Sequence, residues 1–207
     1  FRFFISIIFF IFIITVLINL FSPNSNADIS DLLFQSISII TTTGFSVGDT
    51  SGWAPSIGFL LLIGAFIGAC SGSVGGGVKS WRVLIMINYA YITLKKMIHP
   101  NAVISLKIGN KSVDDSVASS VWGFFSIYVI SFIILLLGLL ITGLDFESAF
   151  SAIGACLNNL GPGLGEVSNN YQSVTPVGKL ILSFAMILGR LEIFTLLVLL
   201  TPAFWNK

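Results

Sequence analysis

Apolar segments of two different lengths alternate along the chain. Segments 3–21 and 117–141 are long enough to cross a bilayer, whose ~30 Å hydrocarbon core takes about 20 helical residues. Segments 29–40 and 146–157 are apolar but too short to cross. A short apolar helix in a membrane has to enter and leave by the same face. The alternation therefore restricts the chain to membrane folds that contain re-entrant helices.

The composition is that of an integral membrane protein. Charged residues make up 9% of the chain and hydrophobic residues 55%, whereas soluble domains carry about 25% charged residues. The apolar runs lack the alternation of an outer-membrane barrel, so we predict an all-α membrane fold. A net charge of +1 argues against a nucleic-acid surface. Cys70 and Cys156 lie in apolar sequence, which favours core positions over a disulfide or a metal site.

The two short segments belong to an internal repeat. The stretches DISDLLFQSISIITTTGFSVGD (28–49) and DFESAFSAIGACLNNLGPGLGE (145–166) align without a gap. Both begin with an aspartate and end with an acid, and Gly44 aligns with Gly161. A repeat of this size predicts two copies of one structural unit.

Each unit is predicted to contain an outer helix, a short helix, a glycine-bearing strand and an inner helix. We expect one unit at 1–96 and the other at 117–207, joined by a polar linker at 97–116. The glycine-rich stretch GACSGSVGGGVKS at 68–80 interrupts the first inner helix, because each interior glycine costs up to about 1 kcal/mol relative to alanine. The second inner helix, 176–200, is predicted to be one continuous span.

A glycine-bearing strand behind a re-entrant helix indicates an ion filter. Non-helical backbone at membrane depth survives only where it is buried in protein or lines water. Its carbonyl oxygens can replace the water around a dehydrated cation, and glycine lets the strand reach φ angles closed to other residues. The short helix would also direct its partly negative C-terminus at the ion path.

The charges predict the orientation of these filters. Acidic residues flank the two short helices: Asp28, Asp31, Asp49, Asp145, Glu147 and Glu166. Basic residues lie on the other side: Arg2, Lys79, Arg82, Lys95, Lys96, Lys107, Lys111 and Lys207; Lys179 is an exception. Because positive loops stay cytoplasmic, we expect the filters to face outward behind an acidic mouth and residues 97–116 to be cytoplasmic.

Six stretches together resemble the C-terminal half of the Trk/Ktr/HKT superfamily of potassium transporters, most closely its TrkH-like members. They are SIITTTGF, LNNLGPGLGE, CSGSVGGGVKSWR, HPNAVISLKIGNKSVDD, LGRLEIFTLLVLL and the closing TPAFWNK. The family fold has four tandem helix, pore-helix, helix repeats around one pore. The resemblance implies that this chain supplies the third and fourth repeats, with the first and second upstream.

The resemblance also implies roles for individual residues. The filter residues would be Thr41, Thr42, Thr43 and Gly44 in the third repeat, and Asn158, Asn159, Leu160 and Gly161 in the fourth. Backbone carbonyls at Thr42, Thr43, Asn159 and Leu160 would hold potassium. The gate would consist of Gly72, Gly75, Gly76, Gly77 and Arg190. A cation within a membrane span costs about 2.5 to 3.5 kcal/mol, so Arg190 has either a pore-side electrostatic role or a structural pairing with carbonyls.

The remaining implications concern ion, partners and location. The family implies potassium uptake across a bacterial-type plasma membrane, with potassium as substrate and no cofactor. Glycine at both filter positions favours potassium over sodium. Family members are homodimers in membrane lipid and bind a cytosolic nucleotide-binding ring of the TrkA type.

Two other functions are compatible with parts of the sequence. An anion-coupled secondary transporter could place a carboxylate substrate at the broken helix and Arg190, but it leaves the two acid-flanked filters unexplained. A non-conducting accessory or assembly subunit is the other alternative, which upstream repeats in the same gene would exclude. An enzyme is not expected, because no nucleophile–base pair or metal cluster occurs in the apolar segments.

Overall fold

A computed structural model describes most of the chain. The described residues are 2–22, 25, 27–46, 53–70, 72–73, 75–99, 104–108, 111–168, 170–200 and 202–205. Some positions used in the sequence analysis lie outside them: Gly48, Asp49, Ser71, Lys207 and the linker residues 100–103 and 109–110.

Helices account for most of the described residues. They are α1 (Arg2–Phe21), α2 (Ile29–Ile40), α3 (Pro55–Ile67), α4 (Ser80–Ile98), α5 (Asp115–Ile141), α6 (Phe146–Leu157), the 3₁₀ turn η2 (Gly165–Val167), α7 (Pro176–Arg190), α8 (Ile193–Leu200) and α9 (Pro202–Trp205). The all-α prediction is confirmed. The linker, predicted as a loop, also contains a small antiparallel pair of strands, β1 (Lys107–Ile108) and β2 (Lys111–Ser112).

The helix lengths match the two classes of apolar segment. α1 and α5 are long and apolar enough to cross a membrane, judged on length and composition. α2, α3 and α6 are apolar but shorter. The predicted bounds of both short helices, 29–40 and 146–157, are confirmed to the residue.

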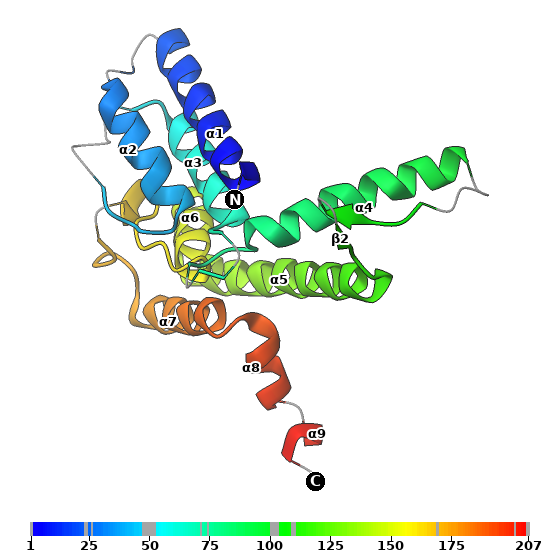
Figure 1. Ribbon diagram of the computed structural model, residues 1–207. Helices are drawn as coiled ribbons and strands as arrows, with labels where there is room; N and C mark the ends of the chain where they lie inside the picture. The colour runs from blue at the N-terminus through cyan, green and yellow to red at the C-terminus, as the bar shows by residue number, and fades with distance from the viewer. Residues whose placement is uncertain are drawn as a thin grey trace.

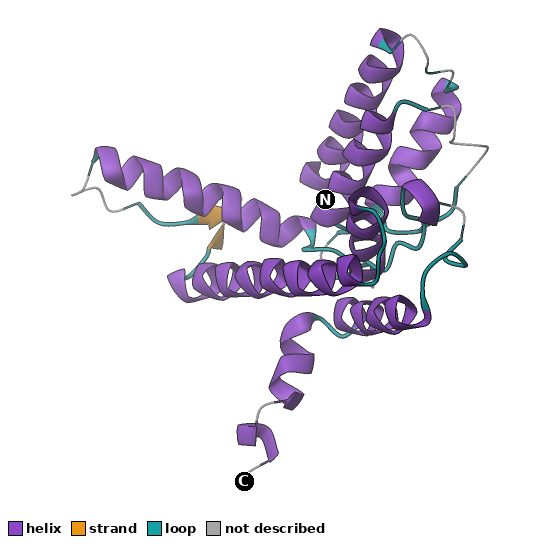
Figure 2. Cartoon of the chain, turned by 180° about the vertical axis from the view of Figure 1, so that it is seen from behind, coloured by secondary structure: helices purple, strands orange, loops and turns teal. Residues whose placement is uncertain are grey.

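The helices form a compact group from which one pair extends. In Figure 1, α1, α2 and α3 stand together, and α6 lies between them and α7. α4 and α5 lead away side by side, as the view from behind also shows (Figure 2). The hairpin packs against this pair through Leu106 and Ile108, which contact a small cluster that includes Ile85 and Ala118.

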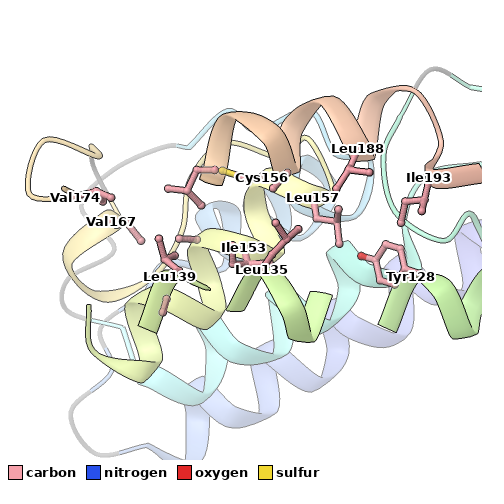
Figure 3. Close-up of a cluster of buried hydrophobic side chains, with 14 of the residues drawn as sticks. Tyr128, Leu135, Leu139, Ile153, Cys156, Leu157, Val167, Val174, Leu188 and Ile193 are labelled. Atoms are coloured by element: carbon pink, nitrogen blue, oxygen red, sulfur yellow. The ribbon is translucent and has the colours of Figure 1, made fainter. Parts of the chain in front are cut away.

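The short helix α6 is the centre of the largest hydrophobic cluster. Its Ile153, Cys156 and Leu157 meet side chains of α5 and α7 (Figure 3). Most of α6 is buried, including the alanines at 149, 152 and 155, whose small side chains let neighbouring helices come close. A 12-residue helix is thus enclosed by longer ones rather than exposed at the surface.

Both inner segments are interrupted. The predicted break in the first is confirmed, since α3 ends at Ile67 and α4 begins at Ser80. The prediction of one continuous span at 176–200 is wrong, because α7 ends at Arg190 and α8 begins at Ile193. Glu192 leaves the helical conformation with a φ of 52°, and its carboxylate pairs with Lys79, which precedes α4, and with Arg82 in the first turn of α4.

The contact between α6 and α7 depends on Gly189. A Cβ at this position would overlap the carbonyl oxygen of Leu157 and lie 2.7 Å from Nδ2 of Asn159. We expect Gly189→Ala to destabilise the folded protein by at least the 1–3 kcal/mol that is typical of overpacking. Thermal unfolding of the detergent-solubilised full-length protein measures this.

Gly123→Ala is the matched control. Gly123 lies within α5, and a Cβ on it would be 3.8 Å from the nearest described atom outside its own helix turn, on Phe194. This change should leave the melting temperature equal or higher, because alanine is the better helix former. Equal melting temperatures for the two variants would contradict the close approach of α7 to α6.

Candidate functional site

α2 and α6 end in the same turn. Thr42 and Asn159, which occupy aligned positions, have left-handed φ angles of 56° and 52°. After α2, the Thr42 N–H donates to Ile39 (3.0 Å) and the Thr43 N–H to Ser38 (2.8 Å). This pair of bonds is the Schellman pattern that closes a helix C-terminus.

The turn after α6 repeats those hydrogen bonds. The Asn159 N–H donates to Cys156 (3.1 Å) and the Leu160 N–H to Ala155 (2.8 Å). A left-handed conformation costs a residue other than glycine about 1–2 kcal/mol. Such strain persists where the surrounding structure enforces it, which is typical of functional sites.

The segments that follow the two turns lie against each other. We call residues 41–46 the α2 tail and residues 158–164 the α6 tail. Gly44 has a φ of 81°, and a Cβ on it would overlap the carbonyl oxygen of Leu160. Gly161 has a φ of 110°, and its Cβ would meet no described atom within 4 Å. The structure thus brings the two tails together. Gly44 lies at the contact between them, whereas Gly161 does not.

The backbone carbonyls of the two tails lack backbone hydrogen-bond donors among the described residues. These carbonyls include the six of Thr42, Thr43, Gly44, Asn158, Asn159 and Leu160. Four of the six are the carbonyls that the sequence analysis assigned to potassium. Carbonyl groups with free lone pairs are the donor set that a dehydrated monovalent cation uses.

The glycine-rich segment, residues 68–79, packs beneath both tails. The Gly76 N–H donates to Oγ1 of Thr42 at 3.1 Å, and a Cβ on Gly76 would overlap the carbonyl of Asn158. A Cβ on Gly75 would lie 2.8 Å from Oγ1 of Thr42. Gly72, by contrast, is exposed, and a Cβ on it would meet no described atom within 4 Å. Glycine is therefore required at 76 by the close approach of the Asn158 backbone, and at 75 by the side chains of Ala69 and Thr42.

Arg190 and the glycine-rich segment face the same cavity. This cavity has a volume of about 200 Å³, and Gly75, Gly76, Gly77, Asn159 and Arg190 are among the residues that line it. The predicted gating residues other than Gly72 are thus brought together next to the α6 tail.

A cluster of three charges borders this cavity. Lys79 Nζ lies 2.5 Å and Arg82 Nη2 lies 2.8 Å from the two carboxylate oxygens of Glu192. The Arg82 guanidinium also lies 4.1 Å from the ring centre of Phe124, a cation–π distance. The identity of the two partners of Glu192 was missed in the sequence analysis.

Two tyrosines that support the α6 tail were also missed. The Tyr128 hydroxyl donates to Oδ1 of Asn158 at 2.7 Å, and both residues are buried. The Tyr171 hydroxyl donates to the carbonyl of Gly161, also at 2.7 Å. The one tyrosine of the apolar segment 117–141 was an available signal for Tyr128. The position of Tyr171 in a loop offered none.

An acidic N-cap begins α6 at the other end. Oδ2 of Asp145 accepts the Ser148 N–H at 3.1 Å. Hydrogen bonds from the side chain and then the backbone of Ser148 hold the pKa of the Asp145 carboxyl below its ordinary value. This exposed carboxyl therefore stays negative at neutral pH.

Comparison with known proteins assigns the family. A model of the TrkH family, described as a cation transport protein, matches residues 3–207. The chain belongs to the TrkH family. A TrkH potassium uptake protein of Halomonas elongata is 51% identical over 84% of this chain and 36% of its own length. The TrkH of Escherichia coli K12 is 44% identical over the whole chain and 44% of its own length.

A solved member of the TrkH family has the same fold. The crystal structure of the potassium transporter TrkH from Vibrio parahaemolyticus superposes with a TM-score of 0.91, at 44% identity. The match covers 99% of this chain and 44% of the other. The chain thus spans less than half the length of these relatives, and its fold is that of an all-helical membrane transporter.

The bond between Tyr128 and Asn158 can be tested by removing one oxygen atom. Nδ2 of Asn158 is buried with no hydrogen-bond partner among the described residues, so Tyr128→Phe would leave both ends of the amide unsatisfied. We expect the variant to lose about 1–3 kcal/mol of stability, measured as a lower melting temperature. Tyr91→Phe, which removes an exposed hydroxyl of α4, should have no effect. Equal melting of the two variants would exclude a stabilising role for the bond.

Proposed function

We propose that the chain forms part of a potassium uptake pathway across the plasma membrane. This proposal rests on the contact between the two tails at Gly44 and Leu160. Both tails carry backbone carbonyls and begin with the same left-handed turn, in a member of the TrkH family. The family description and the names of the relatives support potassium as the ion.

Two tails do not surround an ion. We propose that residues 1–96 are the third and residues 117–207 the fourth of four pore repeats, joined by the linker 97–116. Because the chain spans 44% of its E. coli relative, the first and second repeats would come from the rest of the protein. The ion would then be held by backbone carbonyls at Thr42, Thr43, Asn159 and Leu160 together with those of the missing repeats.

Charge supports an outward-facing filter. Asp28 and Asp145, the residues that precede α2 and α6, lie at the ends of these helices opposite the tails. The linker and the last turn of α4 carry lysines. We place the acidic ends outside, where they attract cations, and the lysine-rich linker in the cytoplasm.

The filter glycines give the first functional test. In the full-length protein, Gly44→Ser and Gly161→Ser should each lower rubidium selectivity over sodium by about tenfold, the equivalent of 1–2 kcal/mol of left-handed strain. Gly44→Ser should be the more severe, because its side chain would also overlap the Leu160 carbonyl. The measurement is rubidium uptake in the presence of competing sodium.

Gly143→Ser is the control for backbone strain. Gly143 has a φ of 92° and no described atom within 4 Å of an added Cβ, as at Gly161, but it lies outside both tails. Its selectivity should match that of the wild type. Unchanged sodium competition in both filter variants at normal expression would refute the filter assignment.

We further propose that the glycine-rich segment and Arg190 close the cytoplasmic side of the filter. The contacts of Gly76 with Thr42 and Asn158 support occlusion by the segment. Arg190 lines the adjoining cavity, where its positive charge raises the barrier to a cation. A cytosolic nucleotide-binding subunit would regulate this closed state, and the transporter would work as a homodimer.

The gate predicts higher flux when it is weakened. Deletion of residues 71–77, or Arg190→Ala, should increase rubidium flux in proteoliposomes and reduce its dependence on the regulatory subunit. Lys96→Ala, which removes an exposed charge from the end of α4, should change neither. If folded protein of both gate variants shows wild-type flux and regulation, the segment is structural packing.

A further inference from the structure

The two tails have aligned sequences but different supports. In the α2 tail, the Ser38 hydroxyl donates to the carbonyl of Phe45 at 2.6 Å. The helix thereby holds its own tail. The position aligned with Ser38 in the second repeat is Ala155, which has no hydroxyl. The α6 tail therefore cannot be held in the same way.

Tyr171 supplies a bond to the α6 tail at nearly the same point. Its hydroxyl donates to Gly161, the residue before the position aligned with Phe45. The ring packs against the cluster around α6, and the Val174 N–H donates to the Tyr171 carbonyl at 3.4 Å. The hydroxyl is thus presented from a packed loop.

The Gly161 carbonyl has few other constraints. Gly161 has a left-handed φ of 110° in open space, and the next residue is Pro162, which has no N–H to donate. Proline fixes the φ angle of residue 162, so the Gly161 carbonyl can reorient only through the φ and ψ angles of Gly161, which glycine leaves less restricted than other residues do. Loss of the Tyr171 bond would therefore let the Gly161 carbonyl reorient next to Leu160, whose own carbonyl contacts Gly44.

We propose that Tyr171 is a positioning residue for ion selection. Its hydroxyl keeps the Gly161 carbonyl out of the ion path and so fixes the Leu160 carbonyl at the distance that potassium requires. This inference rests on the proposed filter function. It also makes the two repeats unequal, since a loop outside the short helix sets the geometry of the fourth filter.

Tyr171→Phe in the full-length protein tests the proposal. The variant keeps the packed ring and removes one oxygen atom, so folding should be preserved. Sodium should compete with rubidium about threefold to tenfold better, the value of one net hydrogen bond. A purely structural role would lower maximal uptake with the amount of folded protein and leave sodium competition unchanged. Tyr91→Phe should behave as the wild type.

A second variant tests whether the bond itself matters. Ala155→Ser in the Tyr171→Phe background places a hydroxyl near the carbonyl of Pro162, the residue aligned with Phe45, and by holding the tail one residue beyond Gly161 it should partly restore rubidium selectivity. A folded double variant that stays as unselective as Tyr171→Phe would count against a tether at this point.

Gly161→Ser distinguishes a failure of the proposed role of Tyr171 from a failure of the filter assignment. If Gly161→Ser changes sodium competition and Tyr171→Phe does not, the role of Tyr171 is refuted and the filter stands. If neither Gly161→Ser nor Gly44→Ser changes it, the filter assignment itself fails.

Discussion

Backbone polar groups at membrane depth must find their partners inside the protein, and this constraint organises the structure. A helix forms most of its backbone hydrogen bonds within itself, but the α2 tail, the α6 tail and the glycine-rich segment do not. The structure brings these three segments together, with the Gly76 N–H on Thr42 and the carbonyls of Leu160 and Asn158 against Gly44 and Gly76. Glycine stands at each contact because a side chain there would overlap a carbonyl. The burial of α6 and the close approach of α7 enclose this meeting point.

The two repeats have the same backbone turn after the short helix, but different side chains stabilise it. The same left-handed turn ends α2 and α6, although threonine stands at one position and asparagine at the other. Thr42 is held from below by the glycine-rich segment. Asn158, in the other turn, is held by Tyr128 of the preceding long helix. Duplication therefore explains the shape of the turns, whereas their support had to be acquired separately in each repeat.

Sequence alone was sufficient where the determinants are local. The apolar patterns placed α2 and α6 to the residue, and the density of glycines located the break between α3 and α4. The break at Glu192 was missed because its partners, Lys79 and Arg82, lie 113 and 110 residues away. Tyr171 was missed for a similar reason, since its role depends on which loop packs against the α6 cluster. The roles of the tails as a filter and of Arg190 as a gate are still predictions.

The charge cluster links the two interrupted inner segments. Lys79 ends the glycine-rich segment and Glu192 occupies the break between α7 and α8, and both have left-handed φ angles, 73° and 52°. Each residue thus leaves helical geometry at the point where their side chains meet. Separating a partly buried ion pair leaves its charges uncompensated, which costs more than the loss of an exposed pair. Arg82 adds a second cation to the same carboxylate. Displacing one inner segment alone would therefore break these ion pairs, whereas moving both together would keep them. The two breaks are energetically coupled for this reason.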